Sequence, residues 1–242
     1  MTVPRNRRAT SLVTMPAHGV YEESATREHE LGSVLFLDGN EYRYAKASEA
    51  LSPGKLATVV VDSDREDTVT VAHGIGTRKV TVTAASAITA NQYQDGFLVV
   101  NDGTGAGRKY CVESHPAIGN GETGEITLKD PLDAAWAVAD TDVTLYTSMY
   151  VVQESNTGQK ECPMGVPEIS VTSGYYFWLQ VRGFLQILTD EVFGDATNGR
   201  VATIGSSTAG SVEAQDAQGE TIAAQVYLAG DTTDAEYHPF VR

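Results

Sequence analysis

Short segments in which apolar and polar residues alternate, each closed by a turn signal, recur along most of this 242-residue chain. Alternation with a period of two is typical of a half-buried β-strand, and Gly, Asn, Asp and Pro mark the turns between strands. The pattern therefore predicts an all-β protein with little helix. The predicted strand segments are 33–37, 41–46, 56–61, 69–71, 80–82, 97–100, 110–112, 126–128, 143–145, 200–204, 211–215, 221–228 and 236–241.

The stretch 97–114, FLVVNDGTGAGRKYCVES, raises the question of a phosphate-binding loop because three glycines alternate before two basic residues. Such a loop requires a helix directly after the glycines, so that its N-terminal dipole reinforces the backbone N–H groups. Here Tyr110 and Val112 alternate with polar residues instead, and Asn101-Asp102-Gly103 is a strong turn signal. The stretch is predicted to be a β-hairpin.

The most apolar segment, 174–188, has the length of a helix but the composition of strands. Its β-branched and aromatic residues and the internal Gly183 favour two strands over one helix. The best candidates for helical turns are 84–90 and 133–138, with Asp133 as a possible N-cap of the second.

Charge is divided unevenly along the chain. The net charge is −15, yet the first ten residues contain Arg5, Arg7 and Arg8 and no acid, which leaves −18 for the rest. So acidic a body argues against nucleic acid or an anionic membrane as a partner, because binding to either depends on positive surface. Residues 1–30, which show no sustained period, are predicted to be an N-terminal arm, with the three arginines as its contact residues; a terminus with incidental arginines is the alternative.

Motifs that would carry chemistry are incomplete. The acidic stretch 62–67 resembles the start of a calcium loop, but Asp67 stands where that loop needs Gly and His73 where it needs Glu, so a solvated acidic turn is favoured. The five histidines have no metal-ligand spacing, and 205–210 is predicted to be a turn and not an oxyanion loop. Cys111 and Cys162 are expected to remain thiols. We predict no catalytic residue, no metal and no cofactor.

Four consecutive aromatic residues, Tyr175, Tyr176, Phe177 and Trp178, are the strongest candidate contact residues. Exposed together, they would form a platform for stacking sugars. On a strand, however, they alternate between two faces, which favours a core face and a subunit or capsid interface.

Three groups of segments carry a resemblance to a known family: GNEYRYAKASEALSPGKLATV near the start, DGFLVVNDGTGAGRKYCVESHP with GEITLKDPL in the middle, and GVPEISVTSGYYFWLQVRGFLQIL with GRVATIGSSTAGSVEAQ near the end. Their order resembles the capsid decoration, or cement, proteins of tailed bacteriophages. The resemblance implies a β-rich protein, and we predict a β-barrel or β-tulip-like body formed by 31–61 plus 147–242. This chain departs from the small decoration proteins in its length, and 62–146 is predicted to be an inserted β module. The resemblance also implies an extended arm that becomes ordered on the capsid.

The function implied is that of a non-enzymatic virion protein that stabilises an icosahedral head from its outer surface. Its expected partners are the major capsid protein and its own copies in a homotrimer, without nucleic acid or membrane, after synthesis in the host cytoplasm. Two alternatives remain open: a tail, fibre or receptor-binding protein that holds glycans through exposed aromatics, and an enzyme such as a depolymerase.

Overall fold

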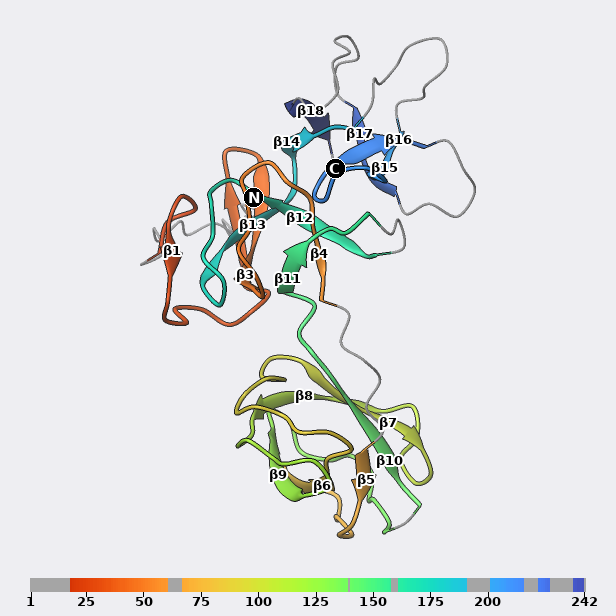
Figure 1. Ribbon diagram of the computed structural model, residues 1–242. Coiled ribbons are helices and arrows are strands. Elements are labelled where there is room, and N and C mark those ends of the chain that lie inside the picture. The colour runs from red at the N-terminus through yellow and green to blue at the C-terminus, as the bar shows by residue number, and fades with distance from the viewer. Residues whose placement is uncertain are drawn as a thin grey trace, which may run out of the picture. The chain divides into compact units, whose positions relative to one another are not determined.

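The computed structural model describes residues 18–60, 67–138, 140–157, 161–190, 201–215, 222–226 and 237–241 (Figure 1). These residues form strands, turns and loops without any helix, so the all-β, barrel-like prediction is confirmed. No membrane-spanning helix is found among them. The chain divides into two compact units, Met1–Val59 with Val152–Arg242 (the body) and Val60–Val151 (the barrel unit). The insert was expected at 62–146, which lies within the barrel unit.

The first sheet of the body contains a closed ring of strands. Its order is β1-β13-β12-β4-β11-β3-β2, and a further pairing of β13 with β3 joins the ends of the five inner strands. The ring strands are β3 (Asn40–Ala47), β13 (Tyr176–Arg182), β12 (Pro163–Pro167), β4 (Ala57–Val59) and β11 (Val151–Glu154); β1 (Glu23–Ser24) and β2 (Val34–Leu37) lie outside the ring.

The strands predicted at 33–37 and 41–46 are confirmed and form a hairpin: β2 pairs with β3 in antiparallel register from Val34↔Arg43 to Leu37↔Asn40. Asp38 and Gly39 form the two-residue loop, with φ of 49° and 84°. Positive φ at both positions is the type I′ geometry that matches the twist of paired strands. Tyr42 and Tyr44 point from β3 into the core, as their alternation predicted.

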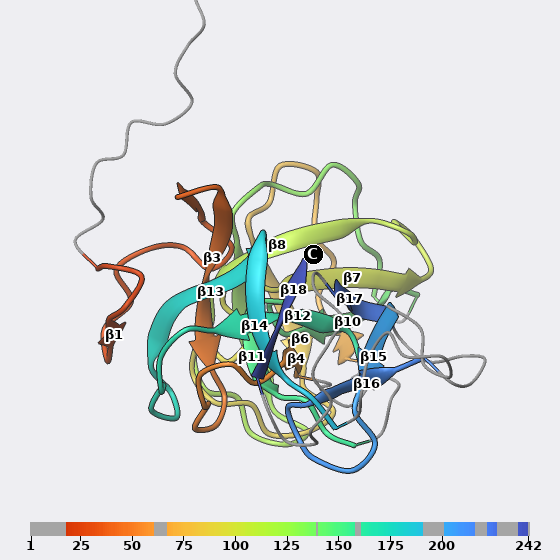
Figure 2. The same cartoon turned by 90° about the horizontal axis from the view of Figure 1, so that it is seen from above.

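The second sheet of the body has the order β14-β18-β17-β15-β16, and Figure 2 shows β14 beside β18. Its strands are β14 (Phe184–Leu188), β18 (Tyr237–Val241), β17 (Ile222–Val226), β15 (Val201–Ile204) and β16 (Val212–Ala214). Gly183, with φ of 109°, separates β13 from β14, so the prediction of two strands in 174–188 is confirmed. Leu56, directly before β4, and Val166 of β12 share a core with Leu185 and Ile187 of the second sheet.

The barrel unit is a closed six-stranded barrel of order β10-β5-β6-β9-β8-β7 (Figure 1). Its strands are β5 (Asp67–Val69), β6 (Lys79–Thr83), β7 (Phe97–Asp102), β8 (Lys109–Ser114), β9 (Thr123–Leu128) and β10 (Asp142–Tyr146). Apolar residues from all six strands fill its core together with Trp136. Closing the sheet satisfies backbone groups that an open edge would leave unpaired. The hairpin predicted at 97–114 is confirmed, because β7 pairs with β8 and Tyr110 and Val112 are buried.

The two predicted helical turns are wrong. Residues 84–90 and 133–138 form bends and isolated bridges, in which Ile88 pairs with Ile118 and Trp136 with His73. Asp133 does not cap a helix: its carboxylate accepts a hydrogen bond from the Tyr110 hydroxyl and pairs with Arg108 at 3.1 Å. Long-range pairing across the barrel overrides the weak local preference for helix. Cys111 and Cys162 form no disulfide.

Candidate binding site

The first described residues of the chain are fixed on the body by an aromatic cluster. Trp178 Nε1 donates to the His18 carbonyl oxygen at 2.8 Å, and His18 Nδ1 lies 3.2 Å from the Tyr44 hydroxyl oxygen. The Tyr44 hydroxyl also accepts from the Glu28 backbone N–H at 3.2 Å, and β1 pairs with β13. Residues 18–30 therefore belong to the body, which corrects the expected arm of 1–30.

Of the four aromatic residues predicted as contacts, two are buried and two are half-buried. Phe177 and Trp178 are only 0% and 3% exposed, so both are core residues of this chain and offer no side-chain surface to a partner. Tyr175 and Tyr176 are half-buried, and Tyr176 stacks on Tyr44 with ring centroids 6.0 Å apart. The interface expected on this strand is thereby restricted to these two tyrosines. The predicted arm contacts Arg5, Arg7 and Arg8 lie outside the described residues.

A pocket of about 560 Å³ opens on the body, a volume within the range of small-ligand sites. Its lining residues come from the segment before β1, the turn before β4, and strands β12, β13 and β14. They are Tyr21, Pro53, Gly54, Val166, Pro167, Glu168, Gln180, Phe184 and Gln186. Tyr21 and Phe184 are largely exposed, which places an aromatic side chain from each of two distant segments at the mouth.

The walls are held by hydrogen bonds between these segments. Gly54 donates its backbone N–H to the Pro167 carbonyl oxygen at 2.9 Å, and Leu188 donates to the Gly54 carbonyl oxygen at the same distance. Gln180 is buried and donates from Nε2 to the Phe184 carbonyl oxygen at 2.9 Å. The pocket is therefore bounded by paired backbone and is largely preformed.

Glu168, directly after β12, is the only carboxylate among the described residues that line the pocket. The Tyr42 hydroxyl donates to its Oε1 at 3.2 Å, whereas Oε2 is screened from solvent and has no hydrogen-bond donor in good geometry among the described residues. Burial raises the pKa of Glu168, and the Tyr42 hydroxyl and the nearby Tyr21 hydroxyl oppose that shift. Burial and the negative charge of Glu168 also raise the pKa of Tyr42.

This arrangement is suited to binding. One carboxylate with a shielded oxygen, an aromatic mouth and two amide side chains can recognise a ligand that donates hydrogen bonds or carries positive charge. The sequence did not indicate Glu168 as a binding residue, because a single acid in an acidic chain gives no spacing signal. The residue lies in the segment GVPEIS, which was noted only for its family resemblance. Only the folding of four separate segments around it makes it distinctive.

The loop at 205–210 is a turn, as predicted, and the backbone N–H groups of Ser206, Ser207 and Thr208 already have acceptors. Asp190 Oδ2 accepts from the N–H groups of Ser207 and Thr208 at 3.1 and 3.0 Å, and Glu213 Oε2 accepts from that of Ser206 at 2.9 Å. An oxyanion hole needs such donors free and converging. Two carboxylates already hold these donors, which excludes this use of the loop.

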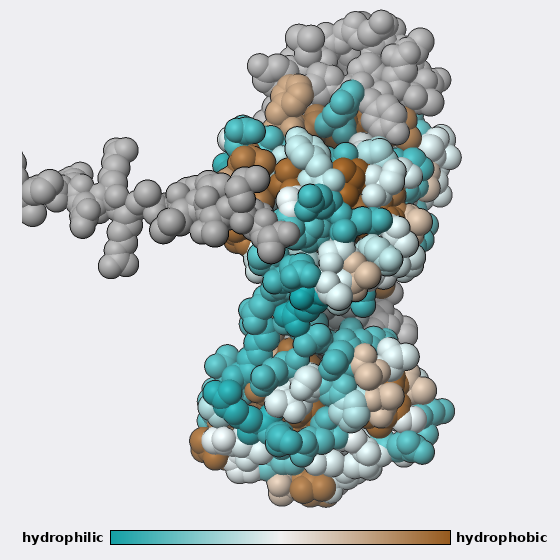
Figure 3. All heavy atoms as spheres, turned by 90° about the vertical axis from the view of Figure 1, so that its left-hand side faces the viewer, coloured by the Kyte–Doolittle hydropathy of each residue, from teal (hydrophilic) through white to brown (hydrophobic). Residues whose placement is uncertain are grey.

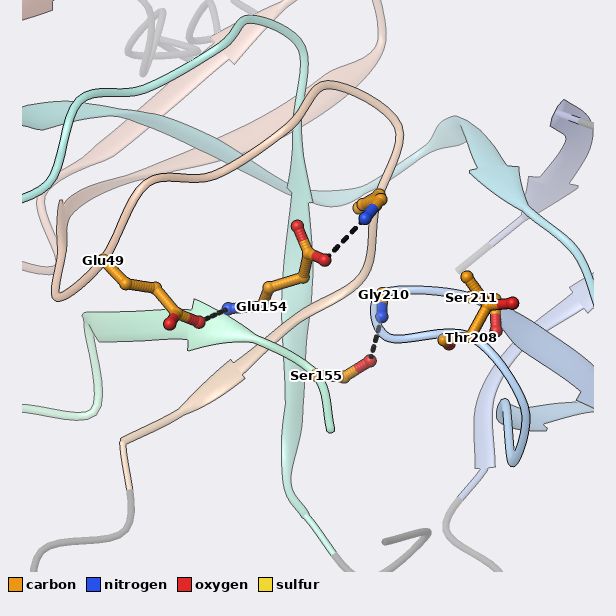
Figure 4. A network of polar contacts seen from close by, with 7 residues as sticks. Glu49, Glu154, Ser155, Thr208, Gly210 and Ser211 are labelled. Atoms are coloured by element: carbon orange, nitrogen blue, oxygen red, sulfur yellow. Dashed lines mark hydrogen bonds and ion pairs between the residues drawn. The ribbon is translucent and has the colours of Figure 1, made fainter. Parts of the chain in front are cut away.

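A polar network anchors the same loop to the end of β11 (Figure 4). The Gly210 N–H donates to Ser155 Oγ at 3.2 Å, and the Glu154 N–H donates to Glu49 Oε1 at 2.9 Å. The Glu154 carboxylate pairs with Lys55 at 2.6 Å. The Gly210–Ser155 contact joins the loop of the second sheet to the first, whereas the contacts of Glu154 tie β11 to the connection between β3 and β4, so the charged residues here have a structural role.

The buried histidines of the barrel unit also have structural roles. His73 Nε2 accepts from the Thr81 N–H at 2.9 Å. His115 Nε2 accepts from the Tyr93 N–H at 3.0 Å, while Nδ1 lies 2.8 Å from the Pro116 carbonyl oxygen. Burial lowers the pKa of His115, which favours the neutral ring that these two hydrogen bonds require.

The prediction of a solvated acidic turn at 62–67 is wrong for its last residue, Asp67. Asp67 is part of β5, fully buried, and its Oδ1 accepts from the Ala85 N–H at 2.8 Å. Residues 62–66 lie outside the described residues. Within the part of the chain that the structure describes, no three His, Cys, Asp or Glu side chains gather as a metal site would require.

Comparison with known proteins gives no relative: no family model, no curated protein and no solved structure matches this chain.

Proposed function

We propose that this protein is a non-enzymatic structural component of a tailed bacteriophage head, which attaches to the outer surface of the capsid and to its own copies. The resemblance in segment order suggests this role. The observation in the structure that supports it best is an edge of the first sheet of the body, where apolar side chains are exposed on a strand that pairs on only one side among the described residues.

That edge is β2. Among the described residues β2 pairs only with β3, and Val34 and Phe36 are 45% and 55% exposed. Leu35 and Leu37 turn inward against the aromatic cluster. An apolar edge strand is a ready template for a strand or sheet of another molecule, and monomeric proteins normally protect such edges with charge or Pro. An apolar edge strand without such protection favours a role in which a second copy of the chain covers the edge.

Charge favours the same role. An acidic body stays soluble and avoids nonspecific contact with DNA, while a segment carrying Arg5, Arg7 and Arg8 is attracted to acidic surface. The face drawn in Figure 3 carries hydrophobic patches interrupted by hydrophilic ones. Such a surface suits several modest contacts, which become strong together because each later contact in an oligomer is intramolecular.

Replacing both Val34 and Phe36 with lysine is expected to weaken self-association at least tenfold, because two charges would be placed on an edge that a second copy must desolvate. Sedimentation velocity over a range of protein concentrations measures this. The matched control is Val71→Lys, which makes the same change at an exposed position of the barrel unit. A wild-type chain that stays monomeric at all concentrations would remove this edge from the proposal.

Attachment to the capsid is tested by co-sedimentation with assembled shells of a phage whose genome encodes the chain. We expect the full chain to sediment with the shells, and deletion of residues 1–10 to weaken binding severalfold more at 50 mM than at 300 mM salt, because the segment acts through charge. Circular dichroism should show an intact fold for the deletion variant. If the full chain fails to sediment with shells, the proposal is wrong.

The glycan-binding alternative loses its main support. Its platform required exposed Tyr175–Trp178 side chains, whereas Phe177 and Trp178 are buried. We therefore do not propose glycan binding as a second function.

A further inference from the structure

The pocket around Glu168 has chemistry that capsid attachment does not use. We propose that it binds an arginine side chain from the Arg5–Arg8 segment of the same chain. The inference concerns the isolated protein and does not depend on the proposed function. It rests on the geometry of the pocket, on charge complementarity and on the course of the chain near Tyr21.

The Glu168 carboxylate has no positively charged partner among the described residues that line the pocket. Glu168 Oε2 is shielded from solvent and has no donor in good geometry among the described residues, and none of the described residues that line the pocket has a cationic side chain. Burial of a carboxylate is costly, and the neutral hydroxyl groups of Tyr42 and Tyr21 offset only part of the desolvation of Glu168. A guanidinium group supplies five N–H donors in a planar fork that fits a carboxylate, and it keeps its charge at any physiological pH.

The rest of the pocket suits the same ligand. Tyr21 and Phe184 at the mouth offer aromatic faces to a planar cation, which is attracted to the negative face of the ring. The apolar wall residues Val166 and Pro167 can pack against the methylene stem of an arginine. The amide side chains of Gln180 and Gln186 provide further hydrogen-bonding groups. The pocket thus matches the head and the stem of one long cationic side chain.

The sequence places such side chains within reach. Arg5, Arg7 and Arg8 precede His18, which is fixed to Trp178, and Tyr21 three residues later lines the pocket. Arg8 lies ten positions before His18, and an extended chain of ten residue steps spans up to about 33–36 Å. A tethered ligand has an effective concentration in the millimolar range, so even a weak site is occupied. This favours the segment of the same chain over that of another copy.

Occupation would reverse the energetic role of Glu168. Without a cation, burial penalises the ionised carboxylate, as the direction of its pKa shift indicates. With a guanidinium group beside it, the ionised form becomes favourable. Removing the charge should therefore have opposite effects on stability, depending on whether the arginines are present.

The experiment is a double-mutant cycle on the full chain that combines Glu168→Gln with the triple variant R5Q/R7Q/R8Q. In the wild-type background, we expect Glu168→Gln to lower the melting temperature of the body by about 2–4 °C. In the triple-glutamine background, we expect it to leave that temperature unchanged or to raise it. Trp178 fluorescence in a Trp136→Phe background reports on the body alone, since the chain has two tryptophans.

The matched control is Glu125→Gln, which removes an exposed acid of the barrel unit paired with Lys79 at 2.6 Å. Its effect should be the same in both backgrounds. An equal effect of Glu168→Gln in both backgrounds would overturn the inference. A difference that grows with protein concentration would assign the pocket to the segment of another copy and would overturn the intramolecular assignment. Carboxyl NMR of Glu168, with a lower pKa in the wild-type chain than in the triple variant, checks the same contact without unfolding.

Discussion

Replacement of Gly103 by alanine is expected to destabilise the barrel unit by about 3 kcal/mol or more. Gly103 has φ of +73°, which disfavours any residue with a Cβ. An added Cβ would also overlap the backbone carbonyl of Asp140. That backbone cannot withdraw easily, because the Asp140 carboxylate accepts hydrogen bonds from the N–H and hydroxyl groups of Thr104 at 3.0 and 2.7 Å.

Gly107 provides the matched control in the same hairpin loop. Its φ of +81° is similar, but nothing lies within 4 Å of the position its Cβ would take. Gly107→Ala should cost only the left-handed backbone penalty, about 1–2 kcal/mol. Hydrogen exchange followed by mass spectrometry measures both variants, since peptides of the barrel unit should lose protection while those of the body keep theirs. Equal losses in the two variants would contradict the close approach of Gly103 to Asp140.

Trp178→Ala is expected to destabilise the body by about 3–5 kcal/mol, the usual cost of truncating a buried large aromatic residue. The substitution removes the indole from the cluster with Tyr42, Tyr44 and Val20. It also removes the hydrogen bond from Nε1 to the His18 carbonyl oxygen. Residues 18–30 should therefore lose hydrogen-exchange protection first, because Trp178 holds their beginning on the sheet.

Phe36→Ala is the control for this variant, since it truncates an aromatic residue that is exposed on β2. It should change the stability of the monomer by no more than about 0.5 kcal/mol. Urea unfolding with hydrogen exchange measures both substitutions at a protein concentration where the wild-type chain is monomeric. A Trp178→Ala protein as stable as wild type would contradict the burial of this residue and would reopen the platform of exposed aromatics.

Local patterns predicted the strands and the tight turns well. The Asp38-Gly39 turn, the Phe97–Asp102 strand with its partner Lys109–Ser114, and the break at Gly183 all follow from a period of two and from residues that tolerate positive φ. These features depend on neighbours in sequence, so a single chain is enough to read them. The prediction of helical turns at 84–90 and 133–138 was wrong because the weak local preference of these segments for helix competes with bridges to distant segments.

The predicted contact residues show more clearly what the sequence alone could not predict. Alternation assigned Tyr176 and Trp178 to one face of a strand and Phe177 to the other, but it could not tell that both faces would be covered. The cover on one face is residues 18–30, which have no strand period of their own beyond Glu23–Ser24. Glu168 was missed for a related reason, since its partner Tyr42 lies 126 positions away.

The sequence by itself determined that this chain is all-β, where most of its strands and turns lie, and that a basic segment precedes an acidic body. The tertiary structure alone decided which sheet edges stay open, which aromatics are core and which acid is enclosed in a pocket. The physical reason is that strand formation and turns are set by residues close in sequence. Burial and the pairing of charges depend on which distant segments fold against each other.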